Sequence, residues 1–173
     1  MPKSFTACYV MSLTVTLPEG PSGQQMHWLA LQGLYGSAPI NRLFNSSLEI
    51  TGEGQSRITF VVDESCFHAG GAAHGTIYFK MLDDAAFYAA NTLVSDRFLL
   101  TTTFNLNFTK PLRAGTVVAE GRWISGRRRV LVAESRLVDQ EGDEIGRGSG
   151  TFMRSRIPLS GLPGYANALK KSD

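Results

Sequence analysis

The chain has 173 residues, of which 43% are hydrophobic and 18% are charged, and its formal net charge is +2. This length fits one domain with a single core, and the composition is ordinary for a folded protein, so disorder is not expected. The small net charge gives no support to nucleic-acid binding, and no apolar run approaches the roughly 20 residues that span a bilayer. The two cysteines, Cys8 and Cys66, have neither the number nor the spacing of a disulfide framework or a metal site. We therefore expect a reducing, cytoplasmic location.

Residues 1–25 end in PEGPSGQQ, a proline- and glycine-rich stretch that predicts a loosely ordered leader. Apolar residues then recur at helical spacing over about 26–35, and Gly36 ends this short helix. Two strand patterns follow, Leu48–Thr51 and Arg57–Val62, with the turn sequence GEGQS between them. This arrangement predicts a β-hairpin.

A long helix is predicted over roughly residues 72–94, where apolar side chains leave almost no polar face. Alternating apolar and polar residues after it predict an antiparallel four-stranded meander with one buried face, over Phe98–Thr109, Thr116–Ser125, Val130–Asp139 and Glu144–Arg154. Residues 155–173 carry two prolines and a basic end, which predicts an irregular tail.

This order of elements predicts an α+β domain over residues 26–154, in which an antiparallel sheet of about five to six strands wraps around one long central helix. One sheet can cover only one side of so apolar a helix. We therefore expect a second copy of the chain to cover the other side, in a homodimer or a dimer-of-dimers tetramer.

The stretch from His68 to Asn91, HAGGAAHGTIYFKMLDDAAFYAAN, carries the candidate chemistry. Its glycine-rich start leaves free backbone N–H groups at the positive end of the helix, where an oxyanion could be held. Asp83 and Asp84 lie inside the apolar helix, and a buried carboxylate is costly unless it is paired or used. Lys80 precedes them by three and four residues, so one of the two is expected to be paired, and spacing does not say which. Amide donors at the start of the helix, which we call its mouth, and a carboxylate further along the same helix favour acyl transfer.

These residues resemble the hotdog-fold acyl-CoA thioesterases, in particular the PaaI-like branch related to the phenylacetate-pathway enzyme. The resemblance rests on the run His74-Gly75-Thr76, on Asp83 nine residues after His74, and on the two alanines that soon follow. A second segment also supports the resemblance, because it is similar to the later strands of the family: FNLNFTKPLRAGTVVAEGRWISGRRRVLVAESRLVDQEGDEIGRGSGTF. The resemblance covers about residues 26–154. It implies the hotdog fold and the hydrolysis of an acyl-coenzyme A thioester to the free acid and CoA.

The resemblance implies roles for Asp83, Gly75, Thr101 and His74, of which His74 is the histidine of the family's His-Gly pair and shapes the start of the helix more than it takes part in chemistry. His68 and Thr76 depart from the family pattern. Asp83 corresponds to the catalytic carboxylate, as general base or as nucleophile, and Gly75 to the residue whose backbone N–H polarises the thioester carbonyl. Thr101 falls where relatives often place a Ser or Thr that helps to orient the attacking water from the partner subunit. His68 stands where many relatives have Asn; it can donate a hydrogen bond to a carbonyl or a water, but it adds a titratable group. Each also has a purely structural explanation, such as close packing for Gly75 or β-propensity for Thr101.

Several cations near two turns could bind the phosphates of coenzyme A, which would be part of the substrate. A solvated hairpin end explains the three arginines of one turn equally well. The expected substrate-binding residues are therefore these cations together with two residues at the start of the long helix. They are His74 and Thr76 at the helix start, and Lys110, Arg113, Arg127, Arg128 and Arg129 near the two turns. No metal or redox cofactor and no nucleic-acid or membrane partner is implied.

Two other functions stay open. A hotdog-fold hydratase or dehydratase of acyl thioesters pairs a histidine with a later carboxylate, and His68 and Asp83 have a spacing of this kind, although the usual His-Phe-Pro-type signature is missing. A non-catalytic module that binds acyl-CoA would not need Asp83. The acyl group itself is not named by the sequence, because aromatic residues at such spacing are more often part of a core.

Overall fold

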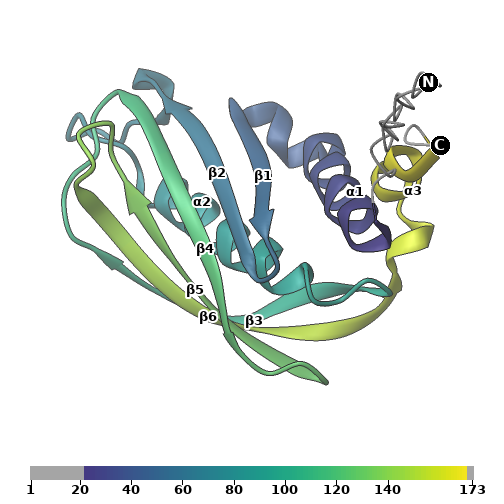
Figure 1. Ribbon diagram of the computed structural model, residues 1–173. Coiled ribbons are helices and arrows are strands. Elements are labelled where there is room, and N and C mark those ends of the chain that lie inside the picture. The colour runs from purple at the N-terminus through teal and green to yellow at the C-terminus, as the bar shows by residue number, and fades with distance from the viewer. Residues whose placement is uncertain (1–21, 171–173) are drawn as a thin grey trace, which may run out of the picture.

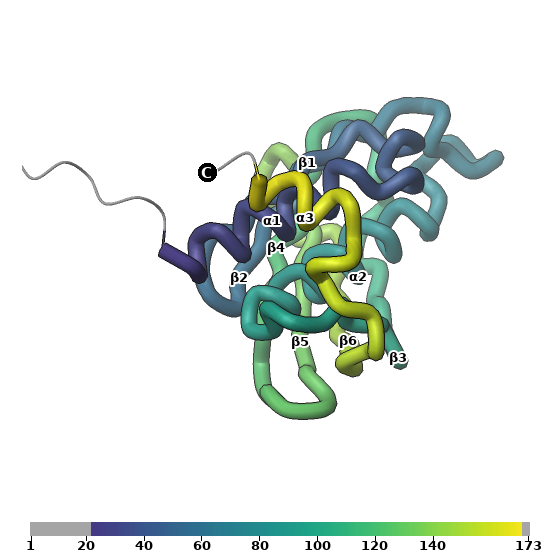
Figure 2. Tube along the Cα trace, turned by 90° about the vertical axis from the view of Figure 1, so that its right-hand side faces the viewer, coloured from purple at the N-terminus to yellow at the C-terminus, as the bar shows by residue number. Residues whose placement is uncertain are grey.

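The computed structural model describes residues 22–170, so most of the expected leader, residues 1–21, lies outside the described part, as do residues 171–173. One antiparallel sheet curls around the helix α2 (Gly75–Asn91) (Figure 1). Two further helices, α1 (Gly23–Ser37) and α3 (Pro163–Lys170), lie side by side at one end of the molecule (Figures 1 and 2). The expected α+β architecture, a sheet wrapped around one central helix, is confirmed.

The sheet has six antiparallel strands in the order β1-β2-β4-β5-β6-β3. Their bounds are β1 Ser46–Gly52, β2 Gln55–Val62, β3 Arg97–Phe108, β4 Gly115–Ser125, β5 Val130–Val138 and β6 Glu144–Pro158. The expected hairpin β1–β2 is confirmed, whereas the expected four-stranded meander is wrong at its first strand.

Strand β3 pairs with β6 at the far edge of the sheet, and β4 pairs with β2 instead. The reason is the path of α2, which carries the chain across the concave face of the sheet, so that β3 begins on the other side (Figure 1). The connection between β3 and β4 then crosses back over residues 109–114, which is too long for a tight hairpin turn. As a result, β3 is a twelve-residue edge strand.

Helix α2 is shorter than the predicted range of 72–94 because a side chain caps its first turn. The His74 Nδ1 accepts a hydrogen bond from the Thr76 N–H at 3.2 Å, which satisfies one of the free amides at the helix start. His74 therefore caps α2, and Gly75 is the first residue of the helix.

Close contacts with the sheet fix the depth of α2. A Cβ added to Gly121 of β4 would overlap the Ala85 carbonyl oxygen, and Ser56 donates a hydrogen bond to that oxygen at 2.6 Å. Ser135 of β5 donates in the same way to the Leu82 carbonyl at 2.7 Å. These contacts hold the middle turn of α2, on which the candidate site is built.

Both ends of the domain are more ordered than expected. Helix α1 begins at Gly23 because Ser22 and Gln25 form a capping box. The expectation of an irregular tail is wrong, because β6 continues to Pro158 and the chain then forms α3. Proline is well suited to the first position of a helix, so Pro163 starts this helix instead of breaking it.

Helix α3 is held against α1 by a buried polar contact. The Tyr165 hydroxyl lies 2.7 Å from His27 Nδ1, and His27 Nε2 lies 3.0 Å from the Asn91 carbonyl oxygen at the end of α2. Burial lowers the pKa of His27, so the ring is neutral near pH 7. This contact joins all three helices.

Within residues 22–170, no helix is both long and apolar enough to cross a membrane. The same residues hold no group of three or more His, Cys, Asp or Glu side chains that could bind a metal ion.

Candidate active site

Asp83 lies in the middle of α2, on a stripe of the helix that the rest of the chain leaves partly open. Its neighbours on this stripe, Thr76 and Phe79, are exposed, and Phe79 is 45% exposed although it is a large apolar residue. Asp83 itself is half-buried, and Thr101 of β3 donates a hydrogen bond to it with 3.0 Å between Oγ1 and Oδ1. The structure thus places Thr101 against Asp83 of its own chain.

The environment of Asp83 makes its carboxylate a better proton acceptor. Burial raises the pKa of Asp83 from its ordinary 3.8 to about 6, while the hydrogen bond from Thr101 lowers it and the neighbouring charge of Asp84 raises it. The group therefore remains mostly ionised at pH 7 and is a stronger base than an ordinary aspartate.

Asp84 is the paired member of the two carboxylates, a point that the sequence left open. Lys80 forms an ion pair with Asp84 and also donates a hydrogen bond to Asn41 Oδ1 at 2.8 Å. Within residues 22–170, no cation forms an ion pair with Asp83. Asp83 is therefore the carboxylate that remains available for chemistry.

A cavity of about 280 Å³ opens beside Asp83. Apart from the polar residues already described, its wall consists mainly of apolar and aromatic side chains. It is lined by Tyr35, Ala38, Ile40, Asn41, Lys80, Asp83, Asp84, Phe87, Tyr88, Phe98, Leu99, Leu100 and Thr101. Sequence reasoning missed the contribution of residues 38–41, because no local pattern shows that a segment some forty residues earlier reaches Asp83.

The start of α2 borders a second hollow of about 370 Å³, which His68 and Gly75 help to line. The Gly75 N–H has no hydrogen-bond acceptor among the described residues. The His68 Nδ1 accepts a hydrogen bond from the Gly70 N–H at 2.9 Å, so the proton of the neutral ring is on Nε2. Both groups can donate a hydrogen bond to an oxygen held at this mouth.

Gly75 has a packing role as well. A Cβ at this position would lie 3.1 Å from Cζ of the Phe108 ring. The ring therefore lies closer to the backbone of Gly75 than a ring usually lies to a residue that has a side chain. The two explanations of Gly75 hold together, since close packing and a free N–H occur at the same residue.

One chain does not bring the mouth and the carboxylate together. Gly75 and Asp83 are eight residues apart in one helix, which corresponds to about 12 Å along its axis. A donor to an oxyanion must lie roughly 3 Å from it. The two hollows of a single chain are therefore too far apart to act on the same carbonyl group.

The expected phosphate-binding cations are divided between the two ends of α2. Lys110 lines the mouth, but its ammonium group is bound by Asp139 and Asp143 at 3.1 and 2.8 Å. Arg113 is exposed in the connection from β3 to β4.

The other three arginines lie in the turn between β4 and β5. Arg127 pairs with Glu53 at 3.5 Å and stacks 4.8 Å from the centre of the Trp123 ring. It borders a hollow with Thr92 and Leu93, at the C-terminal end of α2. Arg127 is thus at the opposite end of the helix from the Gly75 of its own chain, and Arg128 and Arg129 are exposed beside it.

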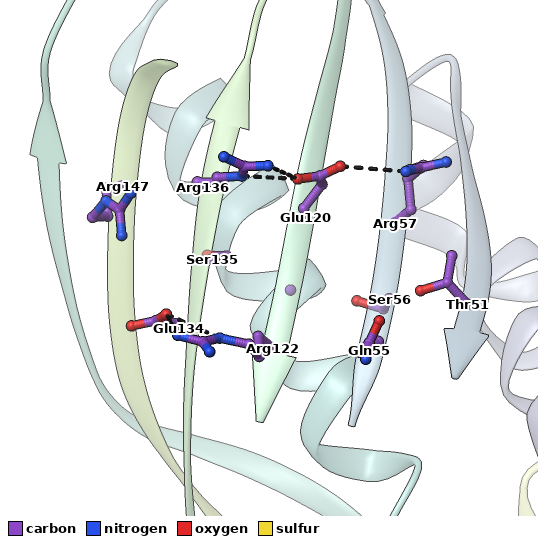
Figure 3. A pocket seen from close by; sticks show the side chains of 11 residues that line it. Thr51, Gln55, Ser56, Arg57, Glu120, Arg122, Glu134, Ser135, Arg136 and Arg147 are labelled. Carbon is purple, nitrogen blue, oxygen red and sulfur yellow. Dashed lines mark hydrogen bonds and ion pairs between the residues drawn. The ribbon is translucent and has the colours of Figure 1, made fainter. Parts of the chain in front are cut away.

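A larger hollow, of about 420 Å³, lies on the face of the sheet turned away from α2 (Figure 3). Most of its charged side chains form ion pairs: Glu120 bridges Arg57 and Arg136, and Arg122 pairs with Glu134. Its lining includes none of the residues predicted from the sequence. We interpret it as a network of ion pairs on a solvated sheet face.

Comparison with known proteins identifies the family. The family model described as Thioesterase superfamily matches residues 70–145. A protein of Saccharolobus solfataricus named "Putative esterase SSO1253" is 31% identical over 101 residues, which are 58% of this chain and 67% of the relative. The chain belongs to the thioesterase superfamily.

Solved structures place this thioesterase-superfamily chain in the hotdog fold. The PaaI protein from the phenylacetic acid degradation operon of E. coli superimposes with a TM-score of 0.72 at 19% identity, over 79% of this chain and 99% of PaaI. A Streptococcus mutans protein solved with acetyl CoA bound gives a TM-score of 0.59 at 19% identity, over 64% of this chain and 89% of that protein. At these identities the likeness establishes the fold, and the expected hotdog family is confirmed.

Proposed function

We propose that the protein is an acyl-CoA thioesterase whose active site forms between two copies of the chain. The observation that carries this proposal is Asp83, a half-buried carboxylate with no ion-pair partner in residues 22–170, a raised pKa and a hydrogen bond from Thr101, beside a largely apolar cavity. Membership of the thioesterase superfamily supports hydrolysis of a thioester. The related fold with acetyl CoA bound supports a coenzyme A ligand.

The reaction needs a water or carboxylate nucleophile and donors for the developing oxyanion. Acting as general base, Asp83 takes a proton from a water that attacks the thioester carbon, while Thr101 holds the carboxylate in place. The Gly75 N–H and the His68 Nε2–H stabilise the negative oxygen of the tetrahedral intermediate. The intermediate collapses with cleavage of the C–S bond, and the thiolate of coenzyme A takes up the proton. Direct attack by Asp83 would form an acyl-aspartate anhydride that water then hydrolyses.

Assembly of two copies would bring the hollow at Gly75 of one copy next to the cavity at Asp83 of the other. The open surface next to them is apolar, with Phe79, Leu100 and Phe108 exposed by 45%, 47% and 58%. Strand β3 beside it is a long unpaired edge, a feature that favours association. A two-fold axis near the middle of α2 would set two such helices antiparallel, with Gly75 of one copy near Asp83 of the other.

The proposal is tested by measuring thiol release from acyl-CoAs of short, medium and long chains and from an aryl-acetyl-CoA. We expect steady-state turnover of at least one of them. Binding of CoA without thiol release from any substrate would contradict the proposal and favour a non-catalytic acyl-CoA module. Hydration or dehydration of the acyl chain without thiol release would favour the hydratase alternative.

A further inference from the structure

The cavity beside Asp83 has one wall that comes from outside the sheet and α2. This wall is η1, a 3-10 helix over Pro39–Leu43 that follows α1. Ile40 and Asn41 of η1 line the cavity together with Phe98 and Leu100 from β3. An acyl group that occupies this cavity would therefore contact both β3 and η1.

Polar contacts fix η1 against α2. The Lys80 ammonium donates a hydrogen bond to Asn41 Oδ1 at 2.8 Å, and Asn41 Nδ2 donates to the Tyr35 carbonyl oxygen at 2.6 Å. The same ammonium group lies 5.2 Å from the centre of the Tyr35 ring and 5.4 Å from that of Phe44. This is within the range of a cation–π contact.

The partner of this lysine is also protected from solvent. The side chains of Lys80 and Asp84 are 15% and 21% exposed, so the pair is screened less by salt and water than a surface pair. Through Asn41, the pair binds a segment about forty residues earlier in the chain. The wall is thus held in one position and is not a loose flap.

The cavity favours a neutral acyl group. The Lys80 charge is neutralised by Asp84, so the charge left beside the cavity is that of Asp83, which would repel an acyl group that ends in a carboxylate. The volume of about 280 Å³ exceeds the roughly 150 Å³ of a cavity that holds benzene. The cavity opens to the surface, so the length of a bound chain depends on the side chains at its rim.

On this basis, and resting on the proposed function, we infer that Ile40 of η1 limits the length of the acyl group that the enzyme accepts, and that the Lys80–Asp84 pair positions it by holding Asn41. Ile40 is a large apolar side chain at this rim, since it lines the cavity and is 49% exposed.

The test compares kcat/KM for a series of straight-chain acyl-CoAs between wild type, Ile40→Ala and Leu43→Ala. Leu43 belongs to the same 3-10 helix, is 76% exposed and does not line the cavity, so it is the matched control. In Ile40→Ala the ratio of kcat/KM for long to short chains should rise about tenfold, the size that a pocket changed by a few methylene groups allows. Leu43→Ala should keep the wild-type profile. An unchanged profile in Ile40→Ala, or the same shift in both variants, would overturn the inference.

A binding series separates this inference from the proposed function. The same acyl-CoAs are titrated calorimetrically into Asp83→Asn and into the double variant Asp83→Asn/Ile40→Ala. If wild type releases no thiol, the proposed function fails, but a tighter binding of long chains to the double variant alone would still support Ile40 as the limit. Equal affinities in the two proteins, or no binding of any acyl-CoA, would refute the role of Ile40.

Discussion

Replacing Asp83 with Asn should lower kcat for thioester hydrolysis by a factor of about 10²–10⁴, the usual contribution of a general base. Asn keeps the shape of the side chain and can still accept the hydrogen bond from Thr101, but it cannot take a proton from water or form an anhydride. Thiol release at saturating acyl-CoA measures this change. Affinity for the acyl-CoA, measured by titration calorimetry, should remain close to that of wild type.

The matched control is Asp96→Asn. Asp96 pairs with Arg97 and Arg154 and does not line the Asp83 cavity, so kcat should stay at the wild-type value. A comparable loss of activity in both variants, or full activity in Asp83→Asn, would remove Asp83 from the reaction.

The stability of Asp83→Asn shows whether the substitution damages the fold. The pKa of Asp83 is about 6 in the folded chain, against an ordinary 3.8, so its ionisation opposes folding. The cost is absent below about pH 3.8, grows as the pH rises and is complete above about pH 6. We therefore expect Asp83→Asn to raise the free energy of unfolding at pH 8 by about 1–2 kcal/mol, after allowance for partial exposure, and so to raise Tm. Near pH 3 the substitution should have little effect on Tm. A lower Tm at pH 8 would mean that the lost activity reflects a damaged fold.

Replacing Gly75 with Pro should lower kcat by about 10²–10³, the effect of removing one oxyanion donor. Proline removes the N–H but is favoured at the first position of a helix, where Gly75 lies. The preceding His74, with φ −66° and ψ 146°, already has the extended conformation that proline requires of its neighbour. Thiol release therefore reports on the N–H itself, with little cost to the helix.

Gly75→Ala is the control for crowding at the mouth. Both substitutions add a Cβ that meets the Phe108 ring at 3.1 Å, but alanine keeps the N–H. The activity of Gly75→Ala should lie well above that of Gly75→Pro. Equal losses in the two variants would show that space beside Phe108 matters at this position and that the N–H does not.

The parts of the molecule that the sequence predicted well are those governed by local patterns. The apolar run of α2, the glycine-rich start before it and the alternation in each strand appear within short windows. The same windows contain Gly75 and the pair Asp83 and Asp84, and the resemblance to the hotdog-fold thioesterases is what singles out Gly75 and Asp83.

What the sequence could not predict depends on contacts between distant residues. The pairing of β3 with β6 follows from the path of α2 across the sheet, which no strand pattern encodes. The choice of Asp84 as the partner of Lys80 is fixed in part by Asn41, which lies 39 residues before the lysine. The position of Arg127 at the far end of α2 from Gly75 likewise follows from the long hairpin β4–β5.

Mixing the two inactive variants tests the account most directly. Asp83→Asn and Gly75→Pro subunits are exchanged by reversible dissociation, the mixed assembly is verified by native mass spectrometry, and thiol release is measured. Each mixed dimer should contain one site with both Asp83 and Gly75 intact, so a random mixture should recover about one quarter of wild-type activity. A verified mixture that remains as inactive as the separate variants would contradict a site shared between two copies.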